Sequence, residues 1–254
     1  MSAIVRGELG GAAAAIRFLT CLPLPGRAPS LADLGHALPY FPPVGLLIGG
    51  VLIVLDRLLA PWLARPLLDF VLLAALVTLS GGLHLDGLID TADGLFRPGP
   101  AEQRLATMRE SWAGPRGVAA ALAQLLLQYA ALASLPDTAR APALLLAPLL
   151  GRWAIVYGYV AFPYARRAAG LSLALKQGGT RGTLVAATAI ALAATSLLSW
   201  PTGPLLLACA WLIAALIGRL ALARLGGMSG DVYGASEQLV ETATLLLLPV
   251  FVNR

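Results

Sequence analysis

Charged residues are scarce in this sequence. They make up 12% of its 254 residues, whereas an ordinary soluble domain carries roughly 25%. Hydrophobic residues make up 58%, and the mean hydropathy is +0.80. So few charges cannot cover a globule of this size with polar surface, which excludes a single water-soluble domain. The composition is that of a chain that crosses a membrane several times.

Cysteine and lysine are also nearly absent. The two cysteines, Cys21 and Cys209, lie far apart and provide neither a disulfide framework nor metal-ligand spacing. Lys176 is the one lysine among 18 basic residues, and the arginines are dispersed singly or in pairs between apolar runs. This dispersion is typical of membrane-protein loops, so we expect no nucleic-acid partner. The bias toward arginine indicates a GC-rich bacterial genome, and we expect the bacterial plasma (inner) membrane as the location.

Long apolar runs predict the fold class. A helix needs about 20 apolar residues to cross the hydrocarbon core, and several runs of this kind are separated by proline and glycine. We expect an all-α, polytopic integral membrane protein with about seven transmembrane helices, forming a single catalytic domain over residues 1–254. The expected spans are 41–59, 67–83, 117–135, 141–162, 183–200, 204–223 and 239–252. Residues 1–38 are expected to lie partly on the membrane surface.

The distribution of basic residues predicts the orientation. With the N-terminus in the cytoplasm, thirteen basic residues fall in cytoplasmic segments and four in outside segments. The four are Arg57, Arg65, Arg140 and Arg254. Because cytoplasmic loops of membrane proteins carry the excess of Lys and Arg, we expect a cytoplasmic N-terminus and an outside C-terminus.

Three carboxylates stand out in the segment GGLHLDGLIDTADG, residues 81–94. Asp86, Asp90 and Asp93 have the spacing i, i+4, i+7, which places them within roughly 60° of one helix face. Stacked carboxylates repel one another unless a cation lies between them, and hard oxygen ligands suit Mg²⁺, with Mn²⁺ as a second choice. A solvated acidic helix end is the alternative. Against it, no Lys or Arg is interleaved, and ionisable groups near membrane depth are commonly functional.

Two further residues are candidates for proton transfer. His84 precedes Asp86 by two residues, so a regular helix turns it away from the carboxylate face unless Gly81 and Gly82 unwind the backbone. A catalytic role and a structural hydrogen bond both stay open for this histidine. Asp231 lies in a second, glycine-rich segment, LGGMSGDVYGA. It is a candidate fourth metal ligand or general base, and we expect the base.

Basic and hydroxyl groups that could hold substrate phosphates lie on the same predicted side. The candidates are Arg109, Ser111, Arg166, Lys176 and Arg152. For the loop arginines, a role in setting the topology is the alternative to a binding role. Arg152 differs, because it lies inside an apolar run, where a buried guanidinium needs an anionic partner. That partner is a carboxylate or a ligand phosphate.

At these residues the sequence resembles the cobalamin synthase family, the adenosylcobinamide-GDP ribazoletransferases. The central match is the gapless GGxHxDGxxDTxDG signature at residues 81–94. Further agreement is found at Phe41-Pro42, Gly45, Gly49, Met108-Arg109, Ser111, Gly114, Gly117, Arg152, Tyr164–Arg166, Gly170-Leu171 and Gly226–Ala235. The sequence departs from the family pattern at Cys21, Glu110 and Gln238, where Arg, Asp and Glu are usual.

The resemblance implies a substrate pair and a reaction. A ribose hydroxyl of α-ribazole, or of its 5′-phosphate, attacks the phosphorus next to cobinamide in adenosylcobinamide-GDP, and GMP leaves. Such a transfer is served by metal ions and cationic groups around the phosphates. It would yield adenosylcobalamin or its 5′-phosphate at a cytoplasm-facing site, next to membrane lipid. Whether the chain forms a homo-oligomer stays open.

Two alternatives belong to other classes. A CDP-alcohol phosphotransferase of phospholipid synthesis uses a similar carboxylate cluster, but its signature continues into Ala-Arg where this chain has Leu88-Ile89. A cation-coupled transporter would use the aspartates as an ion site. Transporters commonly contain paired halves with interrupted helices in both, and no second half here repeats the aspartates.

Overall fold

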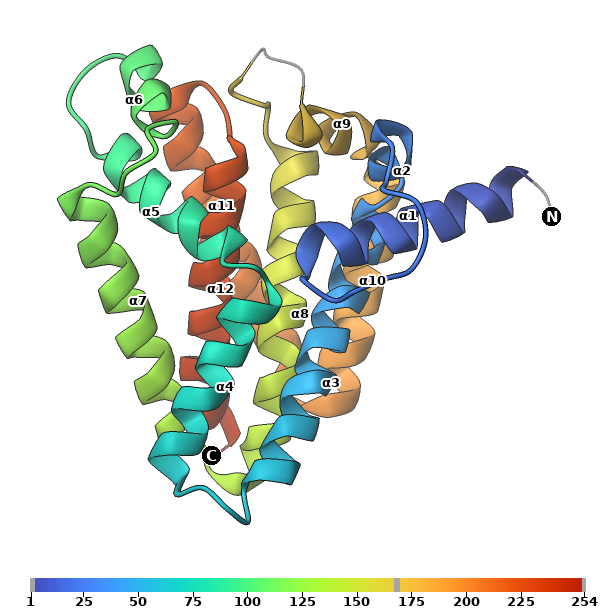
Figure 1. The fold of residues 1–254 in the computed structure, drawn as a ribbon, viewed down its shortest axis with the longest axis vertical. Helices are drawn as coiled ribbons and strands as arrows, with labels where there is room; N and C mark the ends of the chain where they lie inside the picture. The colour runs from blue at the N-terminus through green and yellow to red at the C-terminus, as the bar shows by residue number, and fades with distance from the viewer. Residues whose placement is uncertain (1–2, 167–169, 253–254) are drawn as a thin grey trace.

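The computed structural model describes residues 3–166 and 170–252, and this part of the chain contains helices and no strand. The helices are α1 (Ala3–Leu19), α2 (Leu31–Gly35), the 3₁₀ helix η1 (Leu38–Tyr40), α3 (Phe41–Leu59), α4 (Arg65–Leu79), α5 (Leu83–Leu95), α6 (Ala101–Thr107), α7 (Pro115–Ser134), α8 (Asp137–Ala161), α9 (Leu171–Gly178), α10 (Arg181–Leu198), α11 (Gly203–Leu225) and α12 (Gly230–Val252). The long helices stand side by side as one bundle (Figure 1). The all-α prediction is confirmed.

Five described helices are long and apolar enough to cross a membrane: η1 with α3, α7, α8, α10 and α11. Helices α4 and α5 pass the same test only together, and they are bent by 84° at the break between them. The described part of the chain therefore contains five candidate spans, or six if the bent pair is one. This is fewer than the seven expected. The predicted span 239–252 lies in α12, which contains the buried Glu237 and Glu241 and is not among the candidates.

Helix α8 is the centre of the bundle, with α3 and α12 as its main neighbours. On α3, a Cβ atom at Gly45 would lie 2.5 Å from the carbonyl oxygen of Pro148, and one at Gly49 would lie 2.5 Å from that of Leu144. These two glycines, four residues apart, let α3 and α8 meet backbone to backbone. Small residues at this spacing are a common means of close helix packing in membranes.

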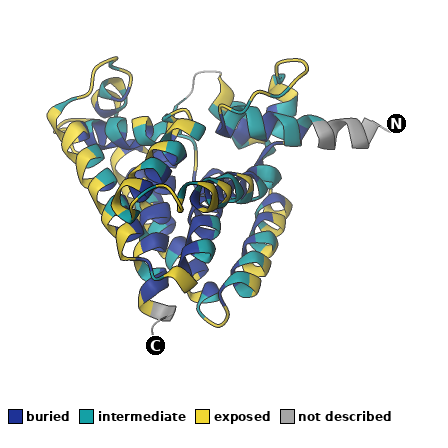
Figure 2. Ribbon diagram, turned by 60° about the horizontal axis from the view of Figure 1, so that its bottom comes forward, coloured by how far each residue is buried: buried dark blue, intermediate teal, exposed yellow. Residues whose placement is uncertain are grey.

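The outer faces of the bundle carry large apolar side chains. Val185, Leu197 and Leu126 are more than half exposed, and Figure 2 shows buried residues along the inner faces of the helices with exposed ones outside. An outer surface of this kind is what a helix bundle presents to lipid, because lipid tails are as apolar as these side chains.

The break between α4 and α5 decides where the aspartates lie. Gly81 and Gly82 have φ angles of +62° and +69°, a left-handed conformation that glycine adopts without steric penalty. The backbone therefore turns at these glycines, but His84 and Asp86 both follow the turn on α5, so the turn does not change their relative positions on that helix. Helix α5 has 13 residues, about 20 Å, which is too short to cross a bilayer. It leads from the upper end of α4 toward α6 (Figure 1).

The two ends of the bundle carry different segments. Helices α6 and α9 lie at the upper end in Figure 1, and α1 runs crosswise to the long helices. The C-terminus and the α3–α4 connection lie at the lower end. Which end faces the cytoplasm stays a prediction.

Candidate active site

The two motifs meet at one cavity of about 230 Å³ near the upper end of the bundle. Its lining comes from α1, α5, α8, the segment after α8, α9 and the start of α12. The lining residues are Phe18, Leu83, His84, Asp86, Gly87, Ile155, Tyr159, Arg166, Leu171, Ser172, Gly230, Asp231, Tyr233 and Gly234. We call it the motif cavity. It joins the 81–94 segment to the glycine-rich segment that contains Asp231.

Glycines bring these two segments into direct contact. A Cβ atom at Gly87 would lie 2.7 Å from the backbone oxygen of Asp231, and one at Gly234 would lie 3.2 Å from the Cα atom of His84. At Gly87 a Cβ atom would force the backbone of Asp231 to shift, and at Gly234 it would be a tight contact with His84. Glycine at both positions therefore allows α5 and α12 to pack closely enough for Asp86 and Asp231 to line the same cavity.

Asp231 is held by two polar neighbours. Arg166 Nη2 donates a hydrogen bond of 2.7 Å to Asp231 Oδ2, and Ser229 Oγ donates one of 3.2 Å to the same oxygen. Burial raises the pKa of Asp231 above its usual range, although Arg166 and Ser229 act in the opposite direction; the nearby carboxylate of Asp86 raises it further. The carboxyl group is thus less acidic than an exposed aspartate and remains next to a permanent positive charge.

Asp90 is close enough to both of these carboxylates to be affected by them. Burial, followed by the charges of Asp231 and Asp86, raises the pKa of Asp90 to about 7. Helix α5 is not one of the five candidate spans. Like charges at close range disfavour joint ionisation unless a cation compensates them. The arrangement therefore favours the binding of a cation or of a strongly hydrogen-bonding ligand.

Asp93 is occupied in a different way. Its two carboxylate oxygens accept hydrogen bonds from the backbone N–H groups of Gly114, at 2.7 Å, and Gly117, at 2.9 Å. It thereby attaches the start of α7 to α5. Asp93 and Asp90 line a second cavity of about 300 Å³, together with Arg97 and Arg116. The sequence analysis did not identify these two arginines as site residues, because their spacing from the aspartates gave no usable signal.

The structure supports part of the expected Mg²⁺ site on α5. Within residues 3–166 and 170–252, no three His, Cys, Asp or Glu side chains converge closely enough to hold a metal ion. Magnesium, however, is usually bound by one or two carboxylates together with substrate phosphates. Asp86 and Asp90 are neighbours on one helix face and have the hard oxygen donors that Mg²⁺ prefers. They fit as the protein's share of a ligand set that a substrate would complete.

His84 is buried, 3% exposed, and belongs to a polar cluster between α5, α8 and α12. Its Nδ1 atom lies 3.5 Å from Glu237 Oε2. Arg152 Nη1 lies 2.5 Å from Glu237 Oε1 and also pairs with Glu241. The anion that Arg152 needs is thus a pair of glutamates. A phosphate-binding role for Arg152 does not fit this position, because its side chain is 1% exposed.

The remaining phosphate-binding candidates are placed differently from Arg166. Lys176 Nζ donates hydrogen bonds to the backbone oxygens of Tyr159 and Phe162 at the end of α8, so its positive charge binds carbonyl groups that a helix leaves unpaired. Arg109 and Ser111 are exposed and line neither cavity. Of the five candidates, the structure brings Arg166 alone into the motif cavity.

Fold and site together define a multi-pass helical membrane protein with an acidic, arginine-containing cavity at one end of its bundle. The chain belongs to the cobalamin-5-phosphate synthase family, whose model matches residues 11–249. This match does not favour a CDP-alcohol phosphotransferase or a transporter.

Three curated relatives, each named adenosylcobinamide-GDP ribazoletransferase, illustrate the similarity. The protein from Desulforamulus reducens is 36% identical over 92% of this chain and 94% of its own length. The Pseudomonas fluorescens protein is 39% identical over 93% and 98%, and that from a Synechococcus species is 40% identical over 90% and 91%. No solved structure matches the chain.

Proposed function

We propose that this protein joins adenosylcobinamide-GDP to α-ribazole, or to α-ribazole 5′-phosphate, with release of GMP. A ribose hydroxyl oxygen forms a bond to the phosphorus next to cobinamide, and the bond from this phosphorus to the GMP leaving group breaks. The product is adenosylcobalamin or its 5′-phosphate. Membership of the family supports this reaction, and the observation that carries it is the meeting of both motifs at one cavity.

Arg166 binds the diphosphate. Its guanidinium lines the motif cavity and stays protonated at any relevant pH. A planar guanidinium matches the geometry of phosphate oxygens and can bind two of them at once. Its present partner, Asp231 Oδ2 at 2.7 Å, shows that the guanidinium reaches the place where the second motif begins.

Asp231 accepts the proton of the attacking hydroxyl. A general base works best when its pKa lies near the operating pH, and burial shifts the pKa of Asp231 in that direction. Ser229 and Arg166 hold the carboxylate in place through one oxygen, Oδ2, and this leaves Oδ1 for the substrate. His84 also lines the cavity, but its Nδ1 atom faces Glu237, which supports a structural role for that side of the ring.

Asp86 and Asp90 hold Mg²⁺, or Mn²⁺ in its place, together with phosphate oxygens of the substrate. When bound, the ion neutralises charge on the diphosphate and on the departing phosphate. Asp93 supports this pair indirectly, because its hydrogen bonds to Gly114 and Gly117 fix the far end of α5.

The motif cavity faces the cytoplasm from the plasma (inner) membrane of a bacterium, with lipid around the apolar outer faces. The charge count in the predicted loops supports this orientation. A Glu102→Cys variant in a background with Cys21 and Cys209 replaced by serine tests it. A membrane-impermeant maleimide should label this cysteine only after the cells are opened, and labelling in intact cells would reverse the orientation.

The reaction is tested with purified protein, adenosylcobinamide-GDP, α-ribazole and Mg²⁺, by measuring released GMP. Release should depend on both corrinoid and ribazole, stop when a chelator removes the metal, and resume when Mg²⁺ is added in excess. Running the assay with α-ribazole and with its 5′-phosphate ranks the two acceptors. Absence of GMP from well-folded protein with both acceptors would refute the proposal.

A further inference from the structure

The second cavity on α5, which Asp90 and Asp93 line, has no role in the reaction as proposed so far. Its volume of about 300 Å³ is at the lower limit of the usual size of small-molecule sites. It lies between α5, the segment that joins α6 to α7, and the start of α7. We call it the α5–α7 cavity. Its lining also includes Glu110, Trp112 and Arg116.

The motif cavity and the α5–α7 cavity follow one another along α5. Asp86 lines the first and Asp90 the second, and one helical turn, about 6 Å along the axis, separates these two aspartates. A diphosphate bound at both can therefore extend into one cavity on each side. In a phosphoryl transfer, the attacking and leaving oxygens lie on opposite sides of the phosphorus. Since Asp231 lines the motif cavity and not the α5–α7 cavity, the leaving nucleotide is expected in the latter.

Glu110 provides a carboxylate whose capacity to accept hydrogen bonds is unused. Its Oε1 atom lies 3.7 Å from Arg97 Nη1, which is too long for a hydrogen bond. Neither oxygen accepts a hydrogen bond within residues 3–166 and 170–252. Arg97 is itself held by Thr107, because it donates a hydrogen bond to the Oγ1 atom of that residue. The ion pair therefore holds the Glu110 carboxylate at the cavity and leaves both of its oxygens available to a ligand.

Guanine is the nucleobase that matches such a carboxylate. Its N1–H and N2–H₂ groups point in the same direction, and the two oxygens of a carboxylate can accept both hydrogen bonds at once. Adenine has a lone pair at N1 and would face the carboxylate with an acceptor. Trp112 lines the same cavity and is 70% exposed, so its ring offers a face on which a base can stack. A membrane-interface anchor is the alternative role for this tryptophan.

The net charge of the cavity points to the base of a nucleotide as the group that its side chains select. Three carboxylates, Asp90, Asp93 and Glu110, line it against the two guanidinium groups of Arg97 and Arg116. The cavity by itself therefore does not attract an anion. Arg116 is exposed and forms no ion pair or hydrogen bond within the described part of the chain, so it is available to the phosphate that is attached to a bound nucleoside.

We propose that the α5–α7 cavity binds the guanosine of the nucleotide substrate, with the guanine edge on Glu110 and the guanine ring on Trp112. This assignment rests on the proposed function, because that function supplies a substrate that contains guanosine diphosphate. It divides the substrate at α5: the reacting phosphorus and the ribazole hydroxyl lie on the side of the motif cavity, and the guanosine lies in the α5–α7 cavity. Glu110 determines the specificity for the base and takes no part in the chemistry.

Isothermal titration of the purified protein in detergent and Mg²⁺ with GDP, IDP and ADP tests this assignment. The three nucleotides have the same diphosphate, so differences in Kd between them depend on the base alone. IDP keeps the N1–H group of guanine and lacks the 2-amino group. GDP should bind at least about 10-fold more tightly than ADP, with IDP between them, as expected for two hydrogen bonds to one side chain. Equal Kd values for GDP and ADP, or no detectable binding of GDP, would overturn the proposal.

Two variants separate the contributions of the edge and the ring of the base. Glu110→Gln should bring the Kd values of GDP and ADP to within about 2-fold, because an amide cannot accept both hydrogen bonds of guanine. Trp112→Leu should weaken all three nucleotides by a similar factor, about 10-fold, since stacking tolerates any base. A preference for GDP that survives Glu110→Gln would overturn the role of Glu110, and unchanged Kd values in Trp112→Leu would make Trp112 an interface anchor only.

Each variant has a matched control at an exposed residue outside the cavity. Glu102→Gln removes one negative charge on the neighbouring helix α6, and Trp62→Leu removes an exposed ring between α3 and α4. Both should change the three Kd values by less than about 2-fold, as is usual for surface substitutions. Equal effects of Glu110→Gln and Glu102→Gln would show a general loss of charge and would contradict the assignment.

The titration does not depend on turnover, so this inference and the proposed function can fail separately. If the protein releases GMP from adenosylcobinamide-GDP but shows no preference for GDP, the inference is wrong and the proposed function stands. If GDP is preferred through Glu110 but no GMP is released from the complete set of substrates, the proposed function is wrong and the cavity remains a site for guanosine nucleotides.

Discussion

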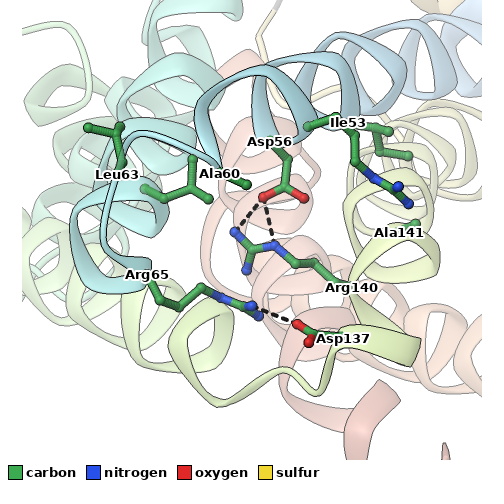
Figure 3. A pocket seen from close by; sticks show the side chains of 10 residues that line it. Ile53, Asp56, Ala60, Leu63, Arg65, Asp137, Arg140 and Ala141 are labelled. Atoms are coloured by element: carbon green, nitrogen blue, oxygen red, sulfur yellow. Dashed lines mark hydrogen bonds and ion pairs between the residues drawn. The ribbon is translucent and has the colours of Figure 1, made fainter.

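The two ends of the bundle differ in how their acidic and basic side chains balance. At the end that carries the α3–α4 connection, which we call the distal end, Arg140 lies between Asp56 and Asp69, and Arg65 pairs with Asp137 (Figure 3). At the end with the motif cavity, aspartates from α5 and α12 gather around Arg166, and burial and mutual repulsion raise their pKa values. The distal end contains three arginines and three aspartates, since Arg65 also lies 3.5 Å from Asp69 and Arg57 is close by, so its charges balance; the motif end has an excess of carboxylates. Because unbalanced, partly buried charge is costly, it is typical of sites where a ligand supplies the compensation.

The largest expected effect on turnover is at Asp86 and Asp90, the aspartates that we propose bind the metal ion. Asp86→Asn and Asp90→Asn should each abolish GMP release, because a neutral amide is a much weaker ligand for Mg²⁺ than a carboxylate. Asp137→Asn is the matched control, the same substitution at the other end of the bundle, and should leave turnover near that of the wild type. Near-normal activity of either α5 variant in well-folded protein would refute the proposed metal site.

Asp231→Asn should reduce turnover by roughly 10²–10⁴-fold, the range expected for loss of a general base. The affinities for substrate and Mg²⁺ should change little, and isothermal titration with Mg²⁺ in the presence of a substrate analogue measures this. A variant that loses Mg²⁺ affinity would make Asp231 a metal ligand instead. A variant with normal turnover would exclude it from the chemistry.

Gly87→Ala tests whether the close contact of α5 and α12 matters. The new Cβ atom would lie 2.7 Å from the backbone oxygen of Asp231, so the two helices must separate. A displacement of about 1 Å at a reacting centre can cost 10²-fold in rate, and we expect a loss of about 10–100-fold. Gly50→Ala on α3 is the control, since nothing lies within 4 Å of its added methyl group. Equal activities of the two variants would contradict this geometry.

The smallest effect on turnover is expected at Arg140, although its effect on stability is large. Arg140→Gln leaves Asp56 and Asp69 buried without their partner, and breaking a buried ion pair in this way typically costs about 3–5 kcal/mol. Thermal unfolding in detergent should show a lower midpoint, while GMP release per folded molecule at low temperature should be unchanged. A selective loss of turnover at wild-type stability would connect the distal end to the chemistry.

Sequence reasoning predicted the all-α membrane fold class correctly, and it placed the three aspartates on one helix. The spacing of Asp86, Asp90 and Asp93 correctly placed them on one helix, but the expected span 67–83 ran through the break at Gly81 and Gly82. The spacing did not reveal that Asp93 is occupied by backbone N–H groups from residues 114 and 117. Such hydrogen bonds depend on how α7 approaches α5, and no local pattern encodes this approach.

For Arg152, too, the sequence predicted one part and the packing of the helices decided the rest. Its place inside an apolar run correctly predicted a specific anionic partner, because a buried guanidinium cannot stay unpaired. The partners, Glu237 and Glu241, lie about 85 residues further along the chain, with the i, i+4 spacing that makes them neighbours on α12. Glu241 lies in the expected span 239–252 and Glu237 lies just before it, which was a usable signal, but the choice between glutamates and a phosphate depended on the packing of α8 against α12.

By itself, the sequence determined the helical membrane class and the helix that carries the aspartates, and it supplied the two glycines at which the chain turns before that helix. These depend on composition, on periodicity and on the φ angles open to glycine, all of which act within a few residues. The tertiary structure alone decided which charges are paired and which are left for a ligand. Pairing requires charged atoms of different helices to lie within about 4 Å of one another, and such distances exist only once Gly45, Gly49 and Gly87 have let the helices pack.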